Sequence, residues 1–174
     1  SGTNLFYLLN TAHDYFYALG FDEAHGNFQT SNFGRGGVGN DAVFAFTQLG
    51  AGTPGSTPYA ASNAWMSTPA DGHVPAMGMF VWGPHTGDFS TDSALDAEVV
   101  LHEFSHGVTG RLGTGLWGPQ GGAINEGKSD IFALNYLTGE DAPPDGSFTA
   151  AAYSSQRFAT GLRTYPTSTR LAVN

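Results

Sequence analysis

The chain has 174 residues and no cysteine, so the sequence predicts one domain or a domain and part of a second, without disulfides or thiol chemistry. Its formal net charge of −9 argues against nucleic acids and anionic membranes as partners. No apolar run approaches the roughly 20 residues of a membrane span, and no basic segment followed by an apolar one opens the chain.

Residues 4–19 carry apolar side chains at helical spacing, and Gly20 follows as the residue expected to end this helix. His13 and Asp14 lie within the helix. They could serve as metal ligands, but a hydrogen-bonded structural pair is the favoured interpretation.

Residues 21–41 mix glycine, asparagine and aromatic residues without a clear period. The glycine-rich stretch at 34–39 resembles a phosphate-binding loop only superficially. No Gly-Lys-Ser/Thr follows it, and the next segment, 43–47, is a predicted strand rather than a helix. A turn or bulge that enters a sheet explains the stretch better.

Two further strands are predicted at 62–66 and 77–82, the second so apolar that we expect it to be buried on both faces. The segment 48–61 is a Gly/Pro/Ser/Thr loop. Ser93 and Asp96 then resemble a capping box at the start of a helix, with Asp in place of the usual Glu.

The predicted helix at about 94–110 contains the sequence His-Glu-x-x-His, with His102, Glu103 and His106 at its fixed positions. Residues four apart share one face of a helix, so both imidazoles can bind the same metal ion. Zinc lowers the pKa of a water molecule, and Glu103 is close enough to take its proton. Two surface histidines on an ordinary helix are the alternative, but the pattern favours a zinc peptidase.

A two-histidine zinc site needs a third protein ligand. Glu126 and Asp130 share a face if residues 125–138 form a second helix. Glu126 can then be the third ligand, and Asp130 can accept the free N–H of His102 or His106. Glu126 as a solvated acid at a helix N-terminus is the alternative.

Short motifs spread over the chain share one pattern of glycine, aromatic and acidic residues: His13-Asp14-Tyr15, Gly20-Phe21-Asp22-Glu23, Gly26-Asn27-Phe28-Gln29, Asn32-Phe33-Gly34-Arg35-Gly36-Gly37, Gly39-Asn40-Asp41, Ser67-Thr68-Pro69-Ala70-Asp71-Gly72 and Gly161-Leu162-Arg163-Thr164-Tyr165-Pro166. Together they resemble the fungalysin family of secreted metallopeptidases over essentially the whole chain. Residues 122–132 look more like thermolysin, a more distant relative, and their spacing from His106 is also thermolysin-like.

The resemblance implies zinc ligands at His102, His106 and Glu126, and a general base at Glu103. It implies that Asp130 is the hydrogen-bond partner of a ligand.

The resemblance also implies a role for Asn63 and Ala64, on an edge strand along which an extended peptide substrate would pair. Ungapped alignment places Trp117 where thermolysin has a tyrosine that helps to bind the oxyanion. Such enzymes use a histidine far downstream as well, whereas here no histidine follows His106. Either Trp117 or Arg163 could then do its work, or the helical half is incomplete.

The expected fold is α+β, a thermolysin-like zincin with a twisted, mostly antiparallel sheet packed on the His-Glu-x-x-His helix and a second, Glu-bearing helix. We expect residues 1–110 to form a sheet-rich lobe that ends in the zinc-binding helix. Residues 111–174, with a glycine-rich loop at 113–122 and a weakly patterned segment at 147–174, would begin a helical lobe that is truncated.

The expected function is that of a secreted zinc endopeptidase, its signal and pro-segment removed, that hydrolyses proteins or peptides with metal-activated water and Glu103 as general base. The alternative is a catalytically impaired, zinc-bearing fragment that acts as a structural or binding domain. Intact Glu103 argues against it, because a purely structural zinc site has no use for a free base.

One Zn²⁺ per chain is the expected cofactor. Ca²⁺ is a further possibility, with Glu98, Asp141 and Asp145 as weak candidates against the interpretation as solvated acids. Neither nucleic acid nor membrane is an expected partner. A missing C-terminal segment, a second chain or a neighbouring copy is expected to cover residues 100–140, whose helices would otherwise expose apolar faces.

Overall fold

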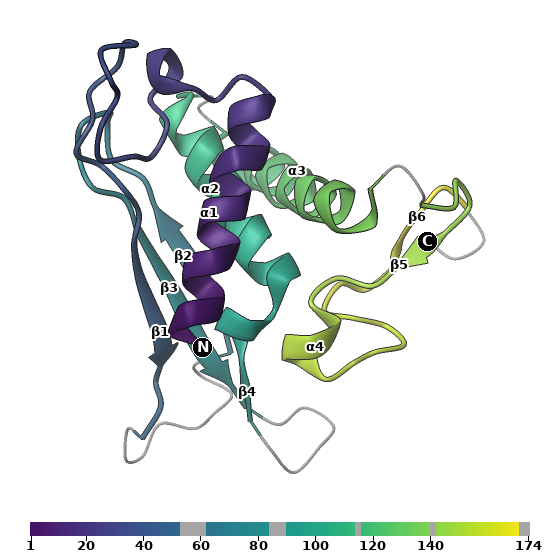
Figure 1. Cartoon of the computed structure of the whole chain (residues 1–174). Helices are drawn as coiled ribbons and strands as arrows, with labels where there is room; N and C mark the ends of the chain where they lie inside the picture. Colours follow the sequence, from purple (N-terminus) through teal and green to yellow (C-terminus); the bar gives the residue numbers. More distant parts are fainter. Residues whose placement is uncertain (53–61, 84–89, 114–115, 140–141, 171–174) are drawn as a thin grey trace.

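A computed structural model of the chain describes residues 1–52, 62–83, 90–113, 116–139 and 142–170 (Figure 1). These residues form an α+β fold with a small mixed sheet and several helices. Within this part of the chain, no helix is both long and apolar enough to cross a membrane.

The helices in chain order are α1 (Gly2–Ala18), α2 (Ala97–Arg111), α3 (Gly118–Thr138) and α4 (Ala152–Ser155), with short 3-10 helices η1 (Glu23–His25) and η3 (Ser93–Leu95). The strands are β1 (Phe44–Leu49), β2 (Ala64–Ser67), β3 (Ala76–Trp82), β4 (Thr91–Asp92), β5 (Ser147–Phe148) and β6 (Thr167–Ser168).

The main sheet has the order β1-β3-β2, and β4 pairs with the end of β3. β1 runs parallel to β3, whereas β2 and β4 run antiparallel to it. The sheet is therefore mixed, with a parallel pair that the expectation of a mostly antiparallel sheet did not include. β3 lies in the middle and is largely buried, as its apolar sequence predicts, and β2 is an edge strand within the described sheet.

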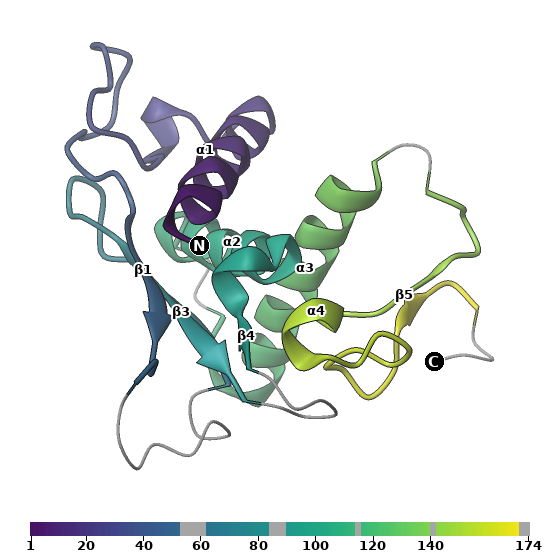
Figure 2. The same ribbon diagram turned by 60° about the horizontal axis from the view of Figure 1, so that its bottom comes forward.

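Helices α1 and α2 cover one face of the sheet (Figures 1 and 2). Phe104 of α2 is almost completely buried at the centre of the core. Its ring stacks on Phe16 of α1 at 5.6 Å and meets the edge of Phe28 at 5.5 Å. Aromatic pairs of this kind add to the stabilisation that burial alone provides, and they fix the rotation of α2 about its axis.

Gly107 allows α2 to approach the sheet closely. A Cβ atom at this position would lie 2.7 Å from the Met66 side chain of β2 and 3.0 Å from the ring of Phe28. Only glycine fits there without a shift of the neighbours. The close contact at Gly107 thereby sets the distance between α2 and β2.

The start of α2 differs from the predicted capping box. Asp96 is the N-cap residue, and its carboxylate accepts a hydrogen bond from the Glu98 backbone N–H at 3.1 Å. Ser93 instead begins the separate helix η3, which Asp92 caps by accepting from the N–H of Ala94. Aspartate is as good an N-cap as serine, so a pattern that offers several caps in a row does not reveal which one the chain uses.

The glycine-rich loop predicted at 113–122 is wrong in its second half. Helix α3 begins at Gly118, seven residues before the predicted start at 125, and Pro119 lies in its first turn. Proline is tolerated there because the first N–H groups of a helix have no intrahelical partner. The glycines weaken this end of the helix without preventing it.

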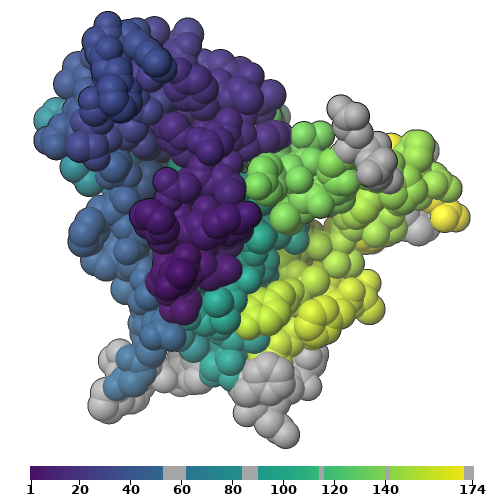
Figure 3. Space-filling view, viewed as in Figure 1, coloured from purple at the N-terminus to yellow at the C-terminus, as the bar shows by residue number. Residues whose placement is uncertain are grey.

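Residues 142–170 lie beside α2 and α3, and α4 contacts β4 at the end of the sheet (Figures 1 and 3). Strands β5 and β6 form a short antiparallel pair at the far end. The part nearer to α2 is anchored by hydrogen bonds, because the N–H of Ser154 donates to Asp96 at 2.9 Å and the Thr91 hydroxyl donates to the Ser154 carbonyl at 2.7 Å.

Two structural interpretations from the sequence agree with the structure. His13 Nδ1 lies 3.1 Å from Asp14 Oδ1, and His13 Nε2 lies 3.1 Å from Gln29 Oε1, so His13 belongs to a local hydrogen-bond network. The stretch 34–39 forms turns that lead towards β1 and precedes no helix.

Candidate metal centre

His102 and His106 lie one turn apart on α2, and their Nε2 atoms are only 2.9 Å from each other. Glu126, on the neighbouring helix α3, reaches both rings. Its Oε1 lies 3.2 Å from His106 Nε2, and its Oε2 lies 3.4 Å from His102 Nε2. Among the described residues, this is the only group of three or more potential metal-binding His, Asp or Glu side chains whose ligand atoms converge.

The Nδ1 atoms of both histidines have partners on α3. His102 Nδ1 lies 2.7 Å from Asp130 Oδ1, and His106 Nδ1 lies 3.3 Å from the hydroxyl of buried Ser129. An N–H at Nδ1 that donates to Asp130 leaves the lone pair of Nε2 directed at Glu126. The arrangement orients both imidazoles towards one point.

The donor atoms fit a zinc ion. Zinc binds imidazole nitrogen and carboxylate oxygen at about 2.0–2.2 Å, so atoms 2.9–3.4 Å apart can share one ion. Three protein ligands leave a fourth position open, as in catalytic zinc sites and unlike closed structural ones.

The charges of the metal-free site support this arrangement. Burial alone would lower the pKa of His102, but its hydrogen bonds to Asp130 and Glu126 raise that pKa to about 9. Hydrogen bonds from His102 and His106 hold the pKa of Glu126 well below its ordinary value. A divalent cation can take over the role that the proton on His102 has in the metal-free chain.

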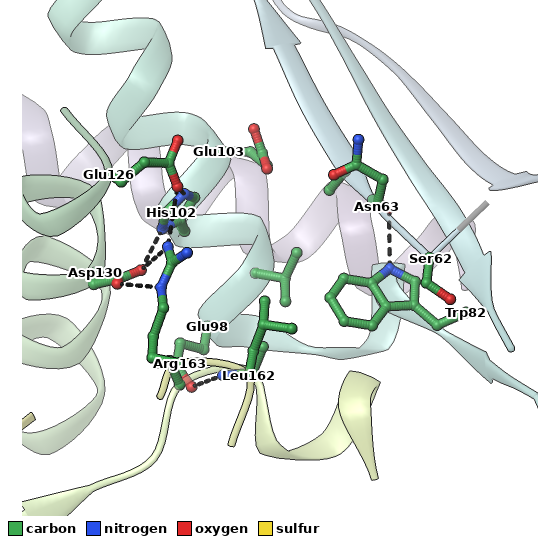
Figure 4. Close-up of a pocket in the computed structure, with 14 residues that line it drawn as sticks. Ser62, Asn63, Trp82, Glu98, His102, Glu103, Glu126, Asp130, Leu162 and Arg163 are labelled. Atoms are coloured by element: carbon green, nitrogen blue, oxygen red, sulfur yellow. Dashed lines mark hydrogen bonds and ion pairs between the residues drawn. The ribbon is translucent and has the colours of Figure 1, made fainter. Parts of the chain in front are cut away.

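Glu103 is buried, and burial raises the pKa of its carboxyl group. It lines the same hollow as His102 and Glu126, and Figure 4 shows it between these residues and Asn63. It makes no hydrogen bond with any described residue. A carboxylate in this position can accept a proton from a water molecule or a ligand in the hollow.

The hollow has a volume of about 140 Å³ and lies between α2, α3, the start of β2 and the segment 150–163. The residues that line it are Ser62, Asn63, Ala64, Trp82, Glu98, Val99, His102, Glu103, Glu126, Asp130, Ala150, Ala151, Leu162 and Arg163.

A family model of the fungalysin metallopeptidases (M36) matches residues 1–174. The chain belongs to the fungalysin family. It is similar to the extracellular metalloproteinase MEP of Pyricularia oryzae, with 39% identity over 180 residues, and to extracellular metalloproteinase 4 of Arthroderma otae, with 39% identity over 181 residues. It is also 37% identical over 178 residues to probable extracellular metalloproteinase 2 of Arthroderma benhamiae.

These alignments include 99–100% of the chain but only 26–27% of each relative. The chain therefore spans about a quarter of the length of the fungalysins that it matches. A metal, usually zinc, is expected of a metallopeptidase family, and His102, His106 and Glu126 are its candidate site in this fungalysin sequence.

The structure brings most, but not all, of the predicted site residues together. Asn63 and Ala64 line the hollow on the side opposite the histidines, and the Asn63 carbonyl accepts a hydrogen bond from the indole of Trp82 at 3.0 Å. Trp117 does not line the hollow. It is the N-cap residue of α3, and 87% of its surface is exposed.

Arg163 connects the site to the C-terminal segment. Its Nε donates to Asp130 at 2.8 Å, and its Nη2 donates to Glu126 at 3.0 Å (Figure 4). These hydrogen bonds raise the pKa of Arg163 and hold the two carboxylates in place. Arg163 lies in the Gly-Leu-Arg-Thr-Tyr-Pro motif of the sequence. The motif did not predict that Arg163 contacts Asp130 and Glu126.

The described residues do not support the possible calcium site. Asp145 is exposed, Asp141 lies outside the described residues, and Glu98 lines the hollow beside the candidate zinc ligands. The position of Glu98 in the hollow is the feature that sequence reasoning missed. Burial raises the pKa of its carboxyl group to about 7.

Proposed function

We propose that the chain is the metal-bearing part of a zinc endopeptidase that hydrolyses peptide bonds in proteins. The single observation that supports this proposal is the convergence of His102, His106 and Glu126 beside the free carboxylate of Glu103. A zinc-bearing domain without turnover, the alternative, would not need a base in the hollow. The names of the relatives support a secreted, extracellular protein.

In the proposed mechanism His102, His106 and Glu126 hold the ion, and Asp130 keeps His102 in the required tautomer. When bound, the metal supplies Lewis-acid activation of a water molecule and of the scissile carbonyl. Glu103 takes the proton of the attacking water and returns it to the leaving amine. The buried position of Glu103 raises its pKa and makes it a better proton acceptor than an exposed carboxylate.

The substrate would lie along β2. This strand pairs only with β3 in the described sheet, so its other edge, which begins at Ala64 next to Asn63, is available to an extended peptide. Pairing through the backbone is tolerant of substrate sequence, as a protease of broad specificity requires.

We further propose that residues 1–110 form a sheet-rich lobe and that residues 111–174 begin a helical one. A further polypeptide segment, whether a C-terminal segment, a second chain or a neighbouring copy, would cover residues 100–140. Two observations support such a covering segment. Trp117 and Ile131 are exposed, and an apolar hollow of about 500 Å³ lies between α1, α2 and α3. Light scattering and intact mass of the purified protein test it.

The function is tested by metal content and by Glu103→Gln. The purified chain should hold one zinc. Glu103→Gln should keep the zinc, since Glu103 is not a ligand, and should lower turnover of a casein-type substrate by roughly 10²–10⁴-fold. Asp14→Asn, which removes an exposed carboxylate on α1, is the matched control with unchanged activity. An undiminished rate in Glu103→Gln would show that Glu103 is not the base.

A further inference from the structure

Glu98 contributes a free acceptor to the hollow that the mechanism above does not use. It lies one helical turn before His102 on α2. Its Oε2 accepts a hydrogen bond from the N–H of Ala151 at 2.9 Å. Its Oε1 has no partner among the described residues and is not sealed from solvent. One oxygen therefore holds the segment 150–163 in place, and the other is available to a ligand.

Part of the wall of the hollow is apolar. Val99 and Leu162 line the hollow next to Glu98, and Trp82, Ala150 and Ala151 complete this side. In Figure 4 Glu98 and Leu162 lie on the side of the hollow where Arg163 enters. A carboxylate set among apolar side chains suits a ligand with an aliphatic stem and a polar head.

No described residue forms an ion pair with Glu98: His102 is the cation that acts on it, while Asp96 and Asp130 add like charge nearby. Arg163 also lines this hollow, but its guanidinium group is bound to Asp130 and Glu126. No ion pair joins it to Glu98 within the described part of the chain. Because a half-buried carboxylate without an ion-pair partner is costly, a cation brought by a ligand would be bound favourably.

The size of the hollow limits the ligand. Its volume of about 140 Å³ is well below the roughly 300–1,000 Å³ of pockets for drug-sized molecules. It has room for about one amino-acid side chain. Since His102, Glu103 and Glu126 line the same hollow, that side chain belongs to a residue next to the reacting bond.

We infer that Glu98 is a specificity-determining residue, and that the hollow takes a lysine or arginine side chain of the substrate residue next to the scissile bond. The aliphatic stem would lie against Val99 and Leu162, and the charged head would donate to Glu98 Oε1. This inference rests on the proposed peptidase function. If Glu98 served only to hold Ala151, the apolar walls would favour leucine or norleucine instead.

The test is calorimetric binding of small hydroxamates to the zinc-loaded chain, which needs no turnover. Lysine hydroxamate and norleucine hydroxamate have side chains of similar length and differ in the terminal ammonium group. We expect lysine hydroxamate to bind at least about fivefold more tightly, because hydrogen bonds between charged groups are the stronger ones. Acetohydroxamate, which has no such side chain, reports on the metal site alone.

Glu98→Gln is the decisive variant, because a glutamine oxygen can still accept from the Ala151 N–H. It should keep zinc and acetohydroxamate binding and lose the preference for lysine over norleucine. Asp14→Asn removes the same charge at an exposed position on α1 and should keep the preference.

Each outcome has one meaning. If acetohydroxamate fails to bind, the proposed metal site is wrong, and this inference is wrong with it. If acetohydroxamate binds but lysine and norleucine hydroxamates bind equally, or Glu98→Gln keeps the preference, only the assignment of Glu98 is overturned.

Discussion

Two groups of charged side chains lie along α2, and they are built differently. At the C-terminal end of the helix, Arg111 donates to Asp41 at 2.6 Å and to Asp71 at 3.2 Å, and the side chains of Arg111 and Asp41 are 3% and 0% exposed. In the middle of the helix, His102 and His106 face Glu126, half of whose side chain is exposed.

The first group pairs its charges within the protein, although Arg111 Nε has no hydrogen-bond partner among the described residues. Arg111 also donates to the carbonyl oxygen of Gly26, and Asp41 accepts from the backbone of Gly72, so this group joins three loops to the end of α2. In the second group, potential ligand atoms of His102, His106 and Glu126 converge on one point, and Arg163 pairs with Glu126 and Asp130 beside them. A sealed cluster of charges indicates a structural role, and an open, convergent one indicates a binding site.

The largest effect is expected from His106→Ala in the open group. Removal of a ligand should weaken zinc binding by more than the roughly 10–100-fold that loss of a ligand's hydrogen-bond partner costs. Zinc titration with a competing chelator measures this loss, and Ser129→Ala, which removes only the partner of His106, provides the smaller reference effect. Unchanged zinc affinity in His106→Ala would contradict the division into sealed and open groups.

Arg111→Met in the sealed group should change stability rather than metal binding. It leaves the buried carboxylate of Asp41 without its counter-charge, which typically costs about 3–5 kcal/mol. Denaturant unfolding of the metal-free chain measures the change. Arg163→Met is the matched variant, and because its partners are more exposed we expect it to cost about 1 kcal/mol or less. Equal costs at the two positions would remove the distinction.

The smallest effect concerns Glu98, which belongs to neither group completely. Its pKa is about 4.5 in the unfolded chain and about 7 in the metal-free fold, where burial raises it. The folded state therefore binds more protons between these values, and its free energy of unfolding falls as the pH rises through this window. Glu98→Gln should remove this pH-dependent loss of free energy of unfolding. We expect the loss to be on the order of 1–2 kcal/mol, a value reduced because the side chain is partly exposed.

Thermal unfolding of wild type and Glu98→Gln at pH 4.5, 6 and 8 tests this sign. The variant should gain on the wild type as the pH rises. A difference that stays constant over the three pH values would show that Glu98 titrates normally in the fold.

The sequence predicted the elements whose pattern is local. The helix at 4–19, three of the four strands of the main sheet and the helix with the His-Glu-x-x-His motif were recognisable because apolar spacing along the chain reflects burial directly. The start of α3 was missed because glycine and proline are signals for loops, while packing against α2 overrides that local preference.

The residues of the site were predictable where a motif carried the chemistry. His102, His106 and Glu126 converge because one helix supplies two of them and the spacing to the next helix supplies the third. Glu98 and Leu162 were not assigned to the hollow, because their meeting depends on how the segment 150–163 folds back onto α2. Trp117 shows the converse error, since alignment without gaps placed in the site a side chain that projects into solvent.

The position of Glu126 on α3 gives a bound ion a further consequence. His106 and Glu126 belong to different helices, so an ion held by both cross-links the two ends of the chain segment between them, much as a disulfide closes a loop. That segment contains the glycine-rich, exposed first turns of α3, which glycine destabilises. Amide hydrogen exchange at residues 118–125 should therefore slow more on zinc loading than exchange in the core of α2, because local opening of these turns would require release of the metal.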